Sequence, residues 1–482
     1  MTTVKDMTQT ASVKSAIAKG AAVNFIGTIS KVLGGPVLYI LLTRLYGKAP
    51  MGIFLVAYNI IEIVSGMAIA GLVDGVMMFT SRYIHNESDK DLLYSYIRRF
   101  FILTAGIGFF FALLGIAGAP ILNSVYYSEY PALARLLQLM AFIIPLEAIT
   151  RLAVAIPKSR MNMHDEVIVI GGVAPVMTLG LSVLFWYFDM GVLGIALAFV
   201  ITYGVTLFVA MGLLSRTVDI ATIFKGRFNR VPTKGILTFA IPQNLNLAFN
   251  RFISSMDVIM LAGFGYPPEQ VAFYSLGAQI VRNGRQIRLI FSGSYAPIIA
   301  RYFHEKRTGE LNHLFATVNG WIISIALPVL FIMGFFRHDL LKLFSSDFTE
   351  RPDFMLILLI SPFWNCATGL AGNAIVMSGF SKWNLANSLG VGIANFLLNM
   401  LLIPTYGLWG AAVATAAAIS FISIIQIIEA RVLIGIRTPL RTLLPWMATG
   451  ALLFVPPFFM DGVNDSLVRR LVYAAIPLAI YL

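Results

Sequence analysis

Charged residues are scarce in this chain of 482 residues. Lys, Arg, Asp and Glu make up only 12% of the sequence, whereas 58% of it is hydrophobic. Soluble globular domains carry roughly 25% charged residues. The deficit of charge excludes an ordinary water-soluble protein and predicts an all-α integral membrane protein.

Cysteine and histidine are also rare. The single Cys366 lies in an apolar stretch and has no second cysteine to pair with, which excludes an internal disulfide. The five histidines lie in polar connections without metal-ligand spacing, so we predict no metal site. The first 20 residues lack the short apolar run and cleavage site of a secretory signal, so we expect no cleaved leader.

Long apolar runs, in contrast, are plentiful. A helix needs about 20 residues to cross a bilayer, and about 14 runs are predicted to span it, of which the last is short. They lie near residues 20–46, 51–80, 100–122, 133–157, 166–188, 191–214, 236–263, 269–300, 314–336, 354–379, 383–404, 407–430, 441–460 and 467–482.

Positive charge is distributed unevenly between the connections. The connection 215–235 is rich in Lys and Arg, whereas the connection 123–131 contains none. Cytoplasmic loops of membrane proteins carry an excess of these residues, so we place the N-terminus in the cytoplasm. The net charge of +12 then matches the anionic lipid of the inner leaflet and does not indicate a nucleic-acid partner.

The sequence contains an internal repeat. Residues 21–46 align with 241–266 at an offset of 220, which pairs Asn24 with Asn244 and Lys31 with Arg251. Two later matches follow in the same order at nearly the same offset. They pair 145–162 with 362–379 and 191–204 with 407–420.

A duplicated unit of six helices predicts two parallel lobes. An even number of helices makes both units enter the membrane from the same side, and transporters built from such repeats place their cargo between them near the midplane. We therefore expect two six-helix lobes around a central cavity. The predicted domains are an N-terminal lobe at 1–215, a basic cytoplasmic linker at 216–235, a C-terminal lobe at 236–434 and two further transmembrane helices at 435–482.

Lys31 and Arg251 are cations in the middle of apolar runs. An ionisable group at bilayer depth is costly and usually faces a bundle interior or an aqueous cavity. Asn24 precedes Lys31 by seven residues, as Asn244 precedes Arg251, and two helical turns place each pair on one face. The pattern predicts that these four residues bind an anionic cargo. The alternative is that helix neighbours neutralise the two cations, which would then be structural.

Three further arginines follow in the run 269–300. Arg282, Arg285 and Arg288 are spaced three apart, so that consecutive members meet on a helix surface. We predict that Arg282 and Arg285 line the cavity, since the planar guanidinium group binds phosphate through two parallel hydrogen bonds. Arg288 is either a gating residue or extends toward the cytoplasmic headgroups.

Acidic residues within the apolar runs are expected to serve coupling or structure. Glu147 and Arg151 have the favourable i,i+4 order and predict a structural ion pair. Asp257 is either a proton or cation site or the counter-charge of a cavity arginine. The predicted gating or coupling residues are Asp257, Arg44, Asp74, Glu62 and Arg288.

The first run is interrupted by Gly34-Gly35-Pro36. Proline removes a helical hydrogen bond and bends the helix, and the bend follows Lys31 directly. A break beside a cavity offers a hinge for a conformational change. A static bend is the alternative.

Three stretches carry a family resemblance. Residues 41–54, 239–246 and 254–280 resemble the polysaccharide-transporter branch of the multidrug/oligosaccharidyl-lipid/polysaccharide exporter superfamily, which contains the O-antigen-type flippases. Asp257 and Arg44 match a recurrent acid and a recurrent arginine of that pattern. The resemblance implies transfer of an undecaprenyl-pyrophosphate-linked oligosaccharide from the inner to the outer leaflet of the bacterial inner membrane by alternating access.

The resemblance also implies an energy source and partners. An ion gradient or the membrane potential would drive transport; H⁺ and Na⁺ both stay open as the coupling ion, and no cofactor is expected. Membrane lipids would be partners, and so would a glycan polymerase. We expect a monomer.

Other functions are weighed against this one. Export of lipid II is close, because that cargo carries the same pyrophosphate. Cation-coupled multidrug efflux is less compatible, since four central cations would repel a cationic drug. A membrane glycan polymerase or ligase is disfavoured, because no carboxylate pair or nucleophile lies at a helix end. We therefore expect no enzymatic activity.

Overall fold

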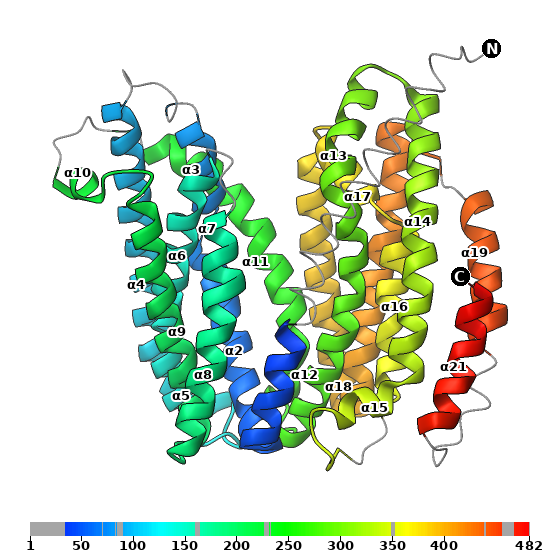
Figure 1. Ribbon diagram of the computed structural model, residues 1–482, viewed down its shortest axis with the longest axis horizontal. Coiled ribbons are helices and arrows are strands. Elements are labelled where there is room, and N and C mark those ends of the chain that lie inside the picture. Colours follow the sequence, from blue (N-terminus) through cyan, green and yellow to red (C-terminus); the bar gives the residue numbers. More distant parts are fainter. Residues whose placement is uncertain are drawn as a thin grey trace. The chain divides into compact units, whose positions relative to one another are not determined.

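The computed structural model describes residues 34–69, 71–81, 83, 90–159, 164–225, 231, 233–348, 352–437, 440–455 and 467–481. Within these ranges the regular secondary structure is entirely helical, with no strand (Figure 1). The all-α prediction is therefore confirmed for the described part of the chain.

The contacts within the chain divide it into two compact units. The N-terminal unit comprises Leu38–Ser275, and the C-terminal unit comprises Leu276–Leu482 together with the described residues 34–37. One boundary thus falls after Val37, one residue beyond Gly34-Gly35-Pro36, and the other falls within α12 (Pro268–Asn283). The division into lobes at residue 215, which was drawn from the repeat, stays a prediction.

Among the described residues, the N-terminal unit contains eleven whole elements. They are α2 (Lys48–Ile69), α3 (Leu72–Ser81), α4 (Lys90–Tyr126), α5 (Leu133–Met140), α6 (Ile143–Lys158), α7 (His164–Glu166), η2 (Val167–Val173), α8 (Ala174–Tyr187), α9 (Gly191–Leu214), α10 (Ile220–Lys225) and α11 (Thr233–Gly263). The unit also includes the helical residues 38–46 and the first half of α12.

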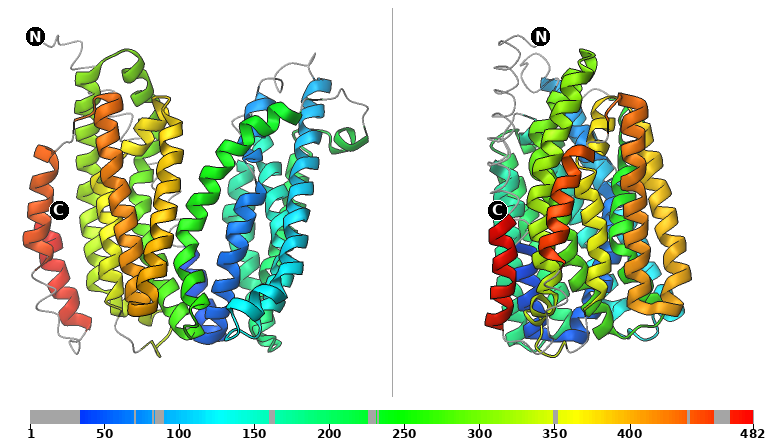
Figure 2. Two further views of the ribbon diagram at one scale, coloured as in Figure 1. Left: turned by 180° about the vertical axis from the view of Figure 1, so that it is seen from behind. Right: turned by 90° about the vertical axis from the view of Figure 1, so that its right-hand side faces the viewer.

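Helix α2 contacts neighbouring helices of the N-terminal unit on several sides. It packs against α4, α5, α6, α9 and α11, and the views of Figure 2 show it alongside α11. Apolar side chains surround much of α2, as expected of a helix buried within a bundle. The contact with α11 explains why α11 belongs to this unit, although the repeat assigns its sequence to the second lobe.

The C-terminal unit contains the rest of α12 and ten further elements. They are η3 (Gly284–Arg288), α13 (Leu289–His304), α14 (Thr308–Phe335), α15 (Arg337–Lys342), α16 (Phe354–Ala367), α17 (Ala371–Met377), α18 (Ser381–Glu429), η4 (Ala430–Ile434), α19 (Leu440–Phe454) and α21 (Leu467–Tyr481). Within α18, two helices meet at Gly407, whose φ of 57° is not helical.

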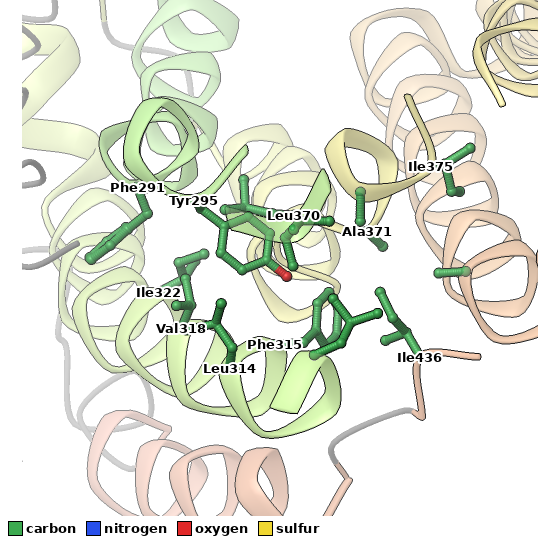
Figure 3. Packing of buried hydrophobic residues seen from close by; sticks show 14 of the residues in the cluster. Phe291, Tyr295, Leu314, Phe315, Val318, Ile322, Leu370, Ala371, Ile375 and Ile436 are labelled. Carbon is green, nitrogen blue, oxygen red and sulfur yellow. The ribbon is translucent and has the colours of Figure 1, made fainter. Parts of the chain in front are cut away.

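A large apolar core holds α13, α14 and α17 together. Figure 3 shows Tyr295 of α13 among Phe315 of α14, Leu370 and neighbouring aliphatic side chains. Tyr295 and Phe315 are each 1% exposed. Helix α14 also packs against α19, and α19 packs against α21, so the two C-terminal helices are attached to this core through α14.

A sharp bend separates α16 from α17. The two helices meet at an angle of 47°, and Gly369 lies between them with a φ of +60°. A Cβ atom at Gly369 would lie 1.5 Å from Oδ1 of Asn319. The nitrogen Nδ2 of Asn319 in turn donates to the carbonyl of Ala367 at 3.4 Å. The bend therefore depends on a residue without a side chain at position 369.

Seven helical runs of the described residues are long and apolar enough to cross a membrane, and the bent pair α16–α17 makes an eighth. The seven are Lys48–Ser81, Lys90–Tyr126, Leu133–Lys158, His164–Tyr187, Gly191–Leu214, Thr308–Phe335 and Lys382–Ile434. Helix α11 and the run from α12 to α13 are outside this group, and they are the helices that carry Arg251 and the three arginines 282, 285 and 288. The total of about 14 spans stays a prediction.

Replacing Gly369 by Ala should destabilise the C-terminal unit. A left-handed conformation costs a non-glycine residue about 1–2 kcal/mol, and overpacking costs about 1–3 kcal/mol more. Thermal unfolding of the purified protein in detergent measures the effect. Gly390→Ala in α18 is the matched control, because a Cβ there meets nothing within 4 Å. Equal midpoints for the two variants would contradict the proposed role of Gly369.

Candidate functional site

Arg251 of α11 lies at the meeting point of three helices of the N-terminal unit. Its Nη1 donates to the backbone carbonyl of Glu62 in α2 at 3.0 Å. Its Nη2 lies 3.5 Å from Oε1 of Glu147 in α6. The side chain is 22% exposed, so it is neither free in solvent nor fully enclosed. An arginine so placed within an apolar chain is a candidate functional residue.

Glu147 is shared between two arginines. Arg151, one turn further along α6, donates from Nε to the same oxygen of Glu147 at 2.7 Å. The Glu147 side chain is 9% exposed, whereas that of Arg151 is 39% exposed. The buried carboxylate of Glu147 thus contacts two guanidinium groups that remain partly exposed. We call Glu147, Arg151 and Arg251 the arginine–glutamate cluster.

Gly66 of α2 makes room for the cluster. A Cβ atom at this position would lie 2.7 Å from Cδ of Arg251. The absence of a side chain therefore allows the stem of Arg251 to lie directly against α2. This close approach brings the guanidinium group within reach of the Glu62 carbonyl, four residues earlier on the same helix.

The structure brings together only part of the predicted site. Asn24 and Lys31 lie outside the described residues. Asn244 lies within α11, but its side chain is also outside the described set. The predicted combination of Lys31 with Arg251 therefore stays a prediction, and the contacts of Arg251 involve Glu62, Glu147 and α2.

The three arginines of the run 269–300 belong to the C-terminal unit. Arg282 lies at the end of α12, whereas Arg285 and Arg288 lie in the 3₁₀ segment η3, and all three are partly buried. Short 3₁₀ segments within long helices often mark functional positions. The Nε atom of Arg288 is buried and has no hydrogen-bond partner among the described residues. A cavity-lining role for these arginines stays a prediction.

The predicted coupling residues occupy different environments. Asp257 is 7% exposed and accepts a hydrogen bond at 2.8 Å from the hydroxyl of Tyr274. Arg44 is exposed, and Glu62 is partly buried. Asp74 lies in the first turn of α3, where a carboxylate is favoured by the positive end of the helix dipole. The expected run 51–80 is divided there, because Gly71 adopts a φ of 64°.

Gly34, Gly35 and Pro36 lie at the start of the described helical residues 34–46. A Cβ atom at Gly34 would meet nothing within 4 Å, and one at Gly35 would meet only Nε2 of Gln279 at 3.6 Å. Neither glycine is therefore required by a close contact. This freedom makes the segment suitable for a test of the predicted hinge.

Sequence reasoning missed the connection between Arg251 and the Glu147–Arg151 pair. The i,i+4 spacing correctly indicated the pair itself. Nothing in the spacing relates it to Arg251, which lies 104 and 100 residues further along. The available signal was one carboxylate, Glu147, and two cations, Arg151 and Arg251, all within apolar runs.

Two other buried arginines make contacts that look structural. Arg337 donates from Nε to Asp353 at 2.9 Å and from Nη1 to the carbonyl of Gly334 at 3.1 Å. Arg470 of α21 donates to Asp339 at 2.7 Å and to the carbonyl of Phe335 at 2.8 Å. The side chains of Arg337 and Arg470 are only 10% and 8% exposed. Each has its own acid, unlike the cluster, where one carboxylate serves two arginines.

Comparison with known protein families gives one match. The family described as "Polysaccharide biosynthesis protein" matches residues 41–350, more than half of the chain. This range includes Glu62 and all three residues of the arginine–glutamate cluster. No match was found among curated protein sequences.

Solved structures show the same fold. The lipid II flippase MurJ in an inward closed conformation has a TM-score of 0.72 at 12% identity, covering 95% of this chain and 98% of that one. An inward-facing MATE-family multidrug resistance transporter of the MOP superfamily has a TM-score of 0.68 at 15% identity, covering 83% and 94%. A MOP-superfamily transporter from Pyrococcus furiosus has a TM-score of 0.62 at 13% identity, covering 88% and 96%.

These similarities extend over nearly the whole length of the compared transporters, and they confirm a multi-pass membrane protein of transporter architecture. The chain belongs to the polysaccharide biosynthesis protein family, and its fold is that of the MOP superfamily.

Proposed function

We propose that the protein is a flippase for a lipid-linked oligosaccharide. The observation that carries the proposal is Arg251, a partly exposed cation on a mid-chain helix whose nearest acid is already paired with Arg151. Such an arrangement attracts an anion more readily than a cation. Family membership in polysaccharide biosynthesis supports a glycan carrier as the source of that anion.

The cargo we propose is an oligosaccharide linked to undecaprenyl pyrophosphate, such as an O-antigen repeat unit. Guanidinium groups bind phosphate through charge-assisted, often paired hydrogen bonds. Arg251 would hold the pyrophosphate, with Lys31, Arg282 and Arg285 as further expected ligands and Asn24 and Asn244 as neighbours on the same helix faces. The polyprenyl chain would stay in lipid, because transferring it to water would expose its apolar surface.

The proposed direction is from the inner to the outer leaflet of the bacterial inner membrane, with the N-terminus in the cytoplasm. Alternating access between two lobes would move the headgroup, driven by H⁺, Na⁺ or the membrane potential. Asp257, Arg44, Asp74, Glu62 and Arg288 are the proposed gating or coupling residues. Membrane lipids and a glycan polymerase are the proposed partners of a monomeric transporter that performs no covalent chemistry.

Lipid II is the second candidate cargo. The similarity to the lipid II flippase MurJ over 95% of this chain favours it, although at 12% identity the likeness concerns the fold alone. Cation-coupled efflux of drugs is less well supported, because two arginines around one acid would repel a cationic drug. Export assays with both lipid-linked substrates separate the first two candidates.

Removing Arg251 or Lys31 should abolish glycan export. A hydrogen bond to a charged group contributes about 1.5–3 kcal/mol, so Arg251→Ala should reduce export by at least about tenfold. Lys31→Ala should do the same if the repeat places it opposite the cargo. Surface glycan, and the lipid-linked repeat unit retained on the cytoplasmic side, are measured in a deletion strain carrying each variant.

Lys158→Ala is the matched control, since Lys158 lies at the end of α6 and pairs with Glu166 at 2.8 Å, outside the cluster. It should export glycan normally. Membrane levels of all variants are compared by immunoblot. Normal export by Arg251→Ala at normal expression would refute the role of Arg251. If the wild-type protein restores the supply of lipid II and does not restore glycan export, lipid II is the cargo.

Stiffening Gly34 and Gly35 should slow transport without preventing binding. Both positions have room for a methyl group, and Ala is favoured over Gly in a helix by about 1 kcal/mol per position. The double alanine variant would then bias a two-state equilibrium by about 30-fold toward the straighter helix. Export rate and substrate affinity are measured separately in proteoliposomes.

The hinge hypothesis requires that the export rate falls while affinity stays within about twofold of wild type. The control is Gly106→Ala in α4, where a Cβ also meets nothing within 4 Å. An unchanged export rate in the double variant would reduce Gly34-Gly35-Pro36 to a static bend.

A further inference from the structure

The two arginines of the cluster retain many unused hydrogen-bond donors. A guanidinium group carries five N–H donors. Arg251 directs one nitrogen to the Glu62 carbonyl and one to Glu147, and Arg151 directs only Nε to Glu147. Among the described residues, the remaining donors of both groups have no hydrogen-bond partner. Donors of this kind, on side chains that are 22% and 39% exposed, are available to a ligand.

The charges around these donors favour an anion. Glu147 is the one acid in direct contact with either guanidinium group within the described part of the N-terminal unit. Glu62 offers Arg251 its backbone carbonyl, and its carboxylate forms no ion pair with a described residue. Two positive groups therefore share one buried negative oxygen, which leaves positive charge on their open edges.

We propose that Arg151 and Arg251 together form an anion seat for a phosphate or pyrophosphate group, with Glu147 as the residue that positions both. The proposal rests on the proposed function and deepens it by making Arg151, which the sequence marked only as a structural partner, a ligand of the cargo. Two adjacent planar guanidinium groups match two linked phosphates, because each can form paired hydrogen bonds to oxygen atoms.

Glu147 suits the positioning role because it is the least exposed member of the cluster. Its side chain is 9% exposed, and both arginines meet the same oxygen, Oε1. The carboxylate therefore contacts one edge of each guanidinium group and leaves the other edges available to a ligand. Arg151 comes from α6 and Arg251 from α11, so Glu147 also links two helices that are far apart in sequence.

The seat lies wholly within the N-terminal unit. Glu62, Gly66, Glu147, Arg151 and Arg251 all fall within Leu38–Ser275. The two guanidinium groups of this seat and the acid that positions them therefore come from one unit, whereas Arg282 and Arg285, proposed above as further ligands, belong to the other. A cargo held in this way would remain attached to one unit during a conformational change, which a transporter requires to move its headgroup from one side to the other.

The test uses the full-length protein in phosphatidylcholine nanodiscs. Binding of inorganic pyrophosphate, farnesyl pyrophosphate and farnesol is measured by calorimetry for the wild type and for Arg151→Gln, Arg251→Gln and Lys158→Gln. We expect Arg151→Gln and Arg251→Gln each to weaken both pyrophosphate ligands by about tenfold or more. Lys158→Gln should stay within about twofold of wild type, and farnesol should not compete.

The two pyrophosphate probes distinguish the source of the ligand. If farnesyl pyrophosphate binds more tightly and is displaced by inorganic pyrophosphate, the seat accepts a lipid-linked phosphate. If both bind equally and still depend on Arg151, the seat accepts a free phosphate group. Either result supports the seat, and wild-type affinity in Arg151→Gln overturns it and returns Arg151 to a purely structural role.

Glu147 is tested by a readout that a structural role would not change. Glu147→Gln should weaken pyrophosphate binding by about fivefold or more, because it removes the charge that orients both guanidinium groups, and Glu147→Asp should restore part of the affinity. Gly66→Ala should also weaken binding, because a Cβ displaces the Arg251 stem. Loss of thermal stability in Glu147→Gln with unchanged affinity would contradict the positioning role.

Failure of the inference and failure of the proposed function give different results. If Arg251→Gln loses glycan export and pyrophosphate binding while Arg151→Gln keeps both, the seat is wrong and the flippase proposal stands. If both variants lose pyrophosphate binding, but deletion of the whole gene leaves export of every lipid-linked glycan at the wild-type rate, the seat is right and the flippase proposal is wrong.

Discussion

The cost of placing a guanidinium group inside an apolar bundle is the constraint on which the N-terminal unit depends. A backbone carbonyl of α2 and a carboxylate of α6 stabilise the charge of Arg251 and offset this cost. A charge deprived of such partners in a region without water would be strongly unfavourable. Helices α2, α6 and α11 must therefore lie close together at this level, and Gly66 permits the approach.

The same constraint separates two kinds of helix. Helices such as α4 and α8 expose large apolar side chains, including Phe109, Leu113 and Val176, and suit contact with lipid tails. Helix α11 and the run from α12 to α13 carry Arg251, Arg282, Arg285 and Arg288 and are less apolar. In a membrane, these charged helices are expected to face protein or water. The division between the apolar helices and the arginine-bearing helices thus follows from where the charge lies.

Satisfied and unsatisfied arginines point to different roles. Arg337 and Arg470 each have an acid and a backbone carbonyl, and they fasten α15 and α21 to α14 and the following segment. Arg151 and Arg251 share one acid and keep open donors. An arginine with its own acid has its charge balanced within the protein, whereas two partly exposed arginines that share one acid keep an attraction for a mobile anion.

The sequence by itself determined the membrane class, the helical fold and most of the apolar runs, because the length and polarity of a run are local properties. It also gave the Glu147–Arg151 pair, whose spacing is set by one helix. Only the tertiary structure decided that Arg251 joins this pair and that α11 packs along α2, since these contacts join residues about 100 or more positions apart. Such contacts depend on how side chains fit between helices, as Gly66 against Arg251 shows, and no periodicity within one helix records that fit.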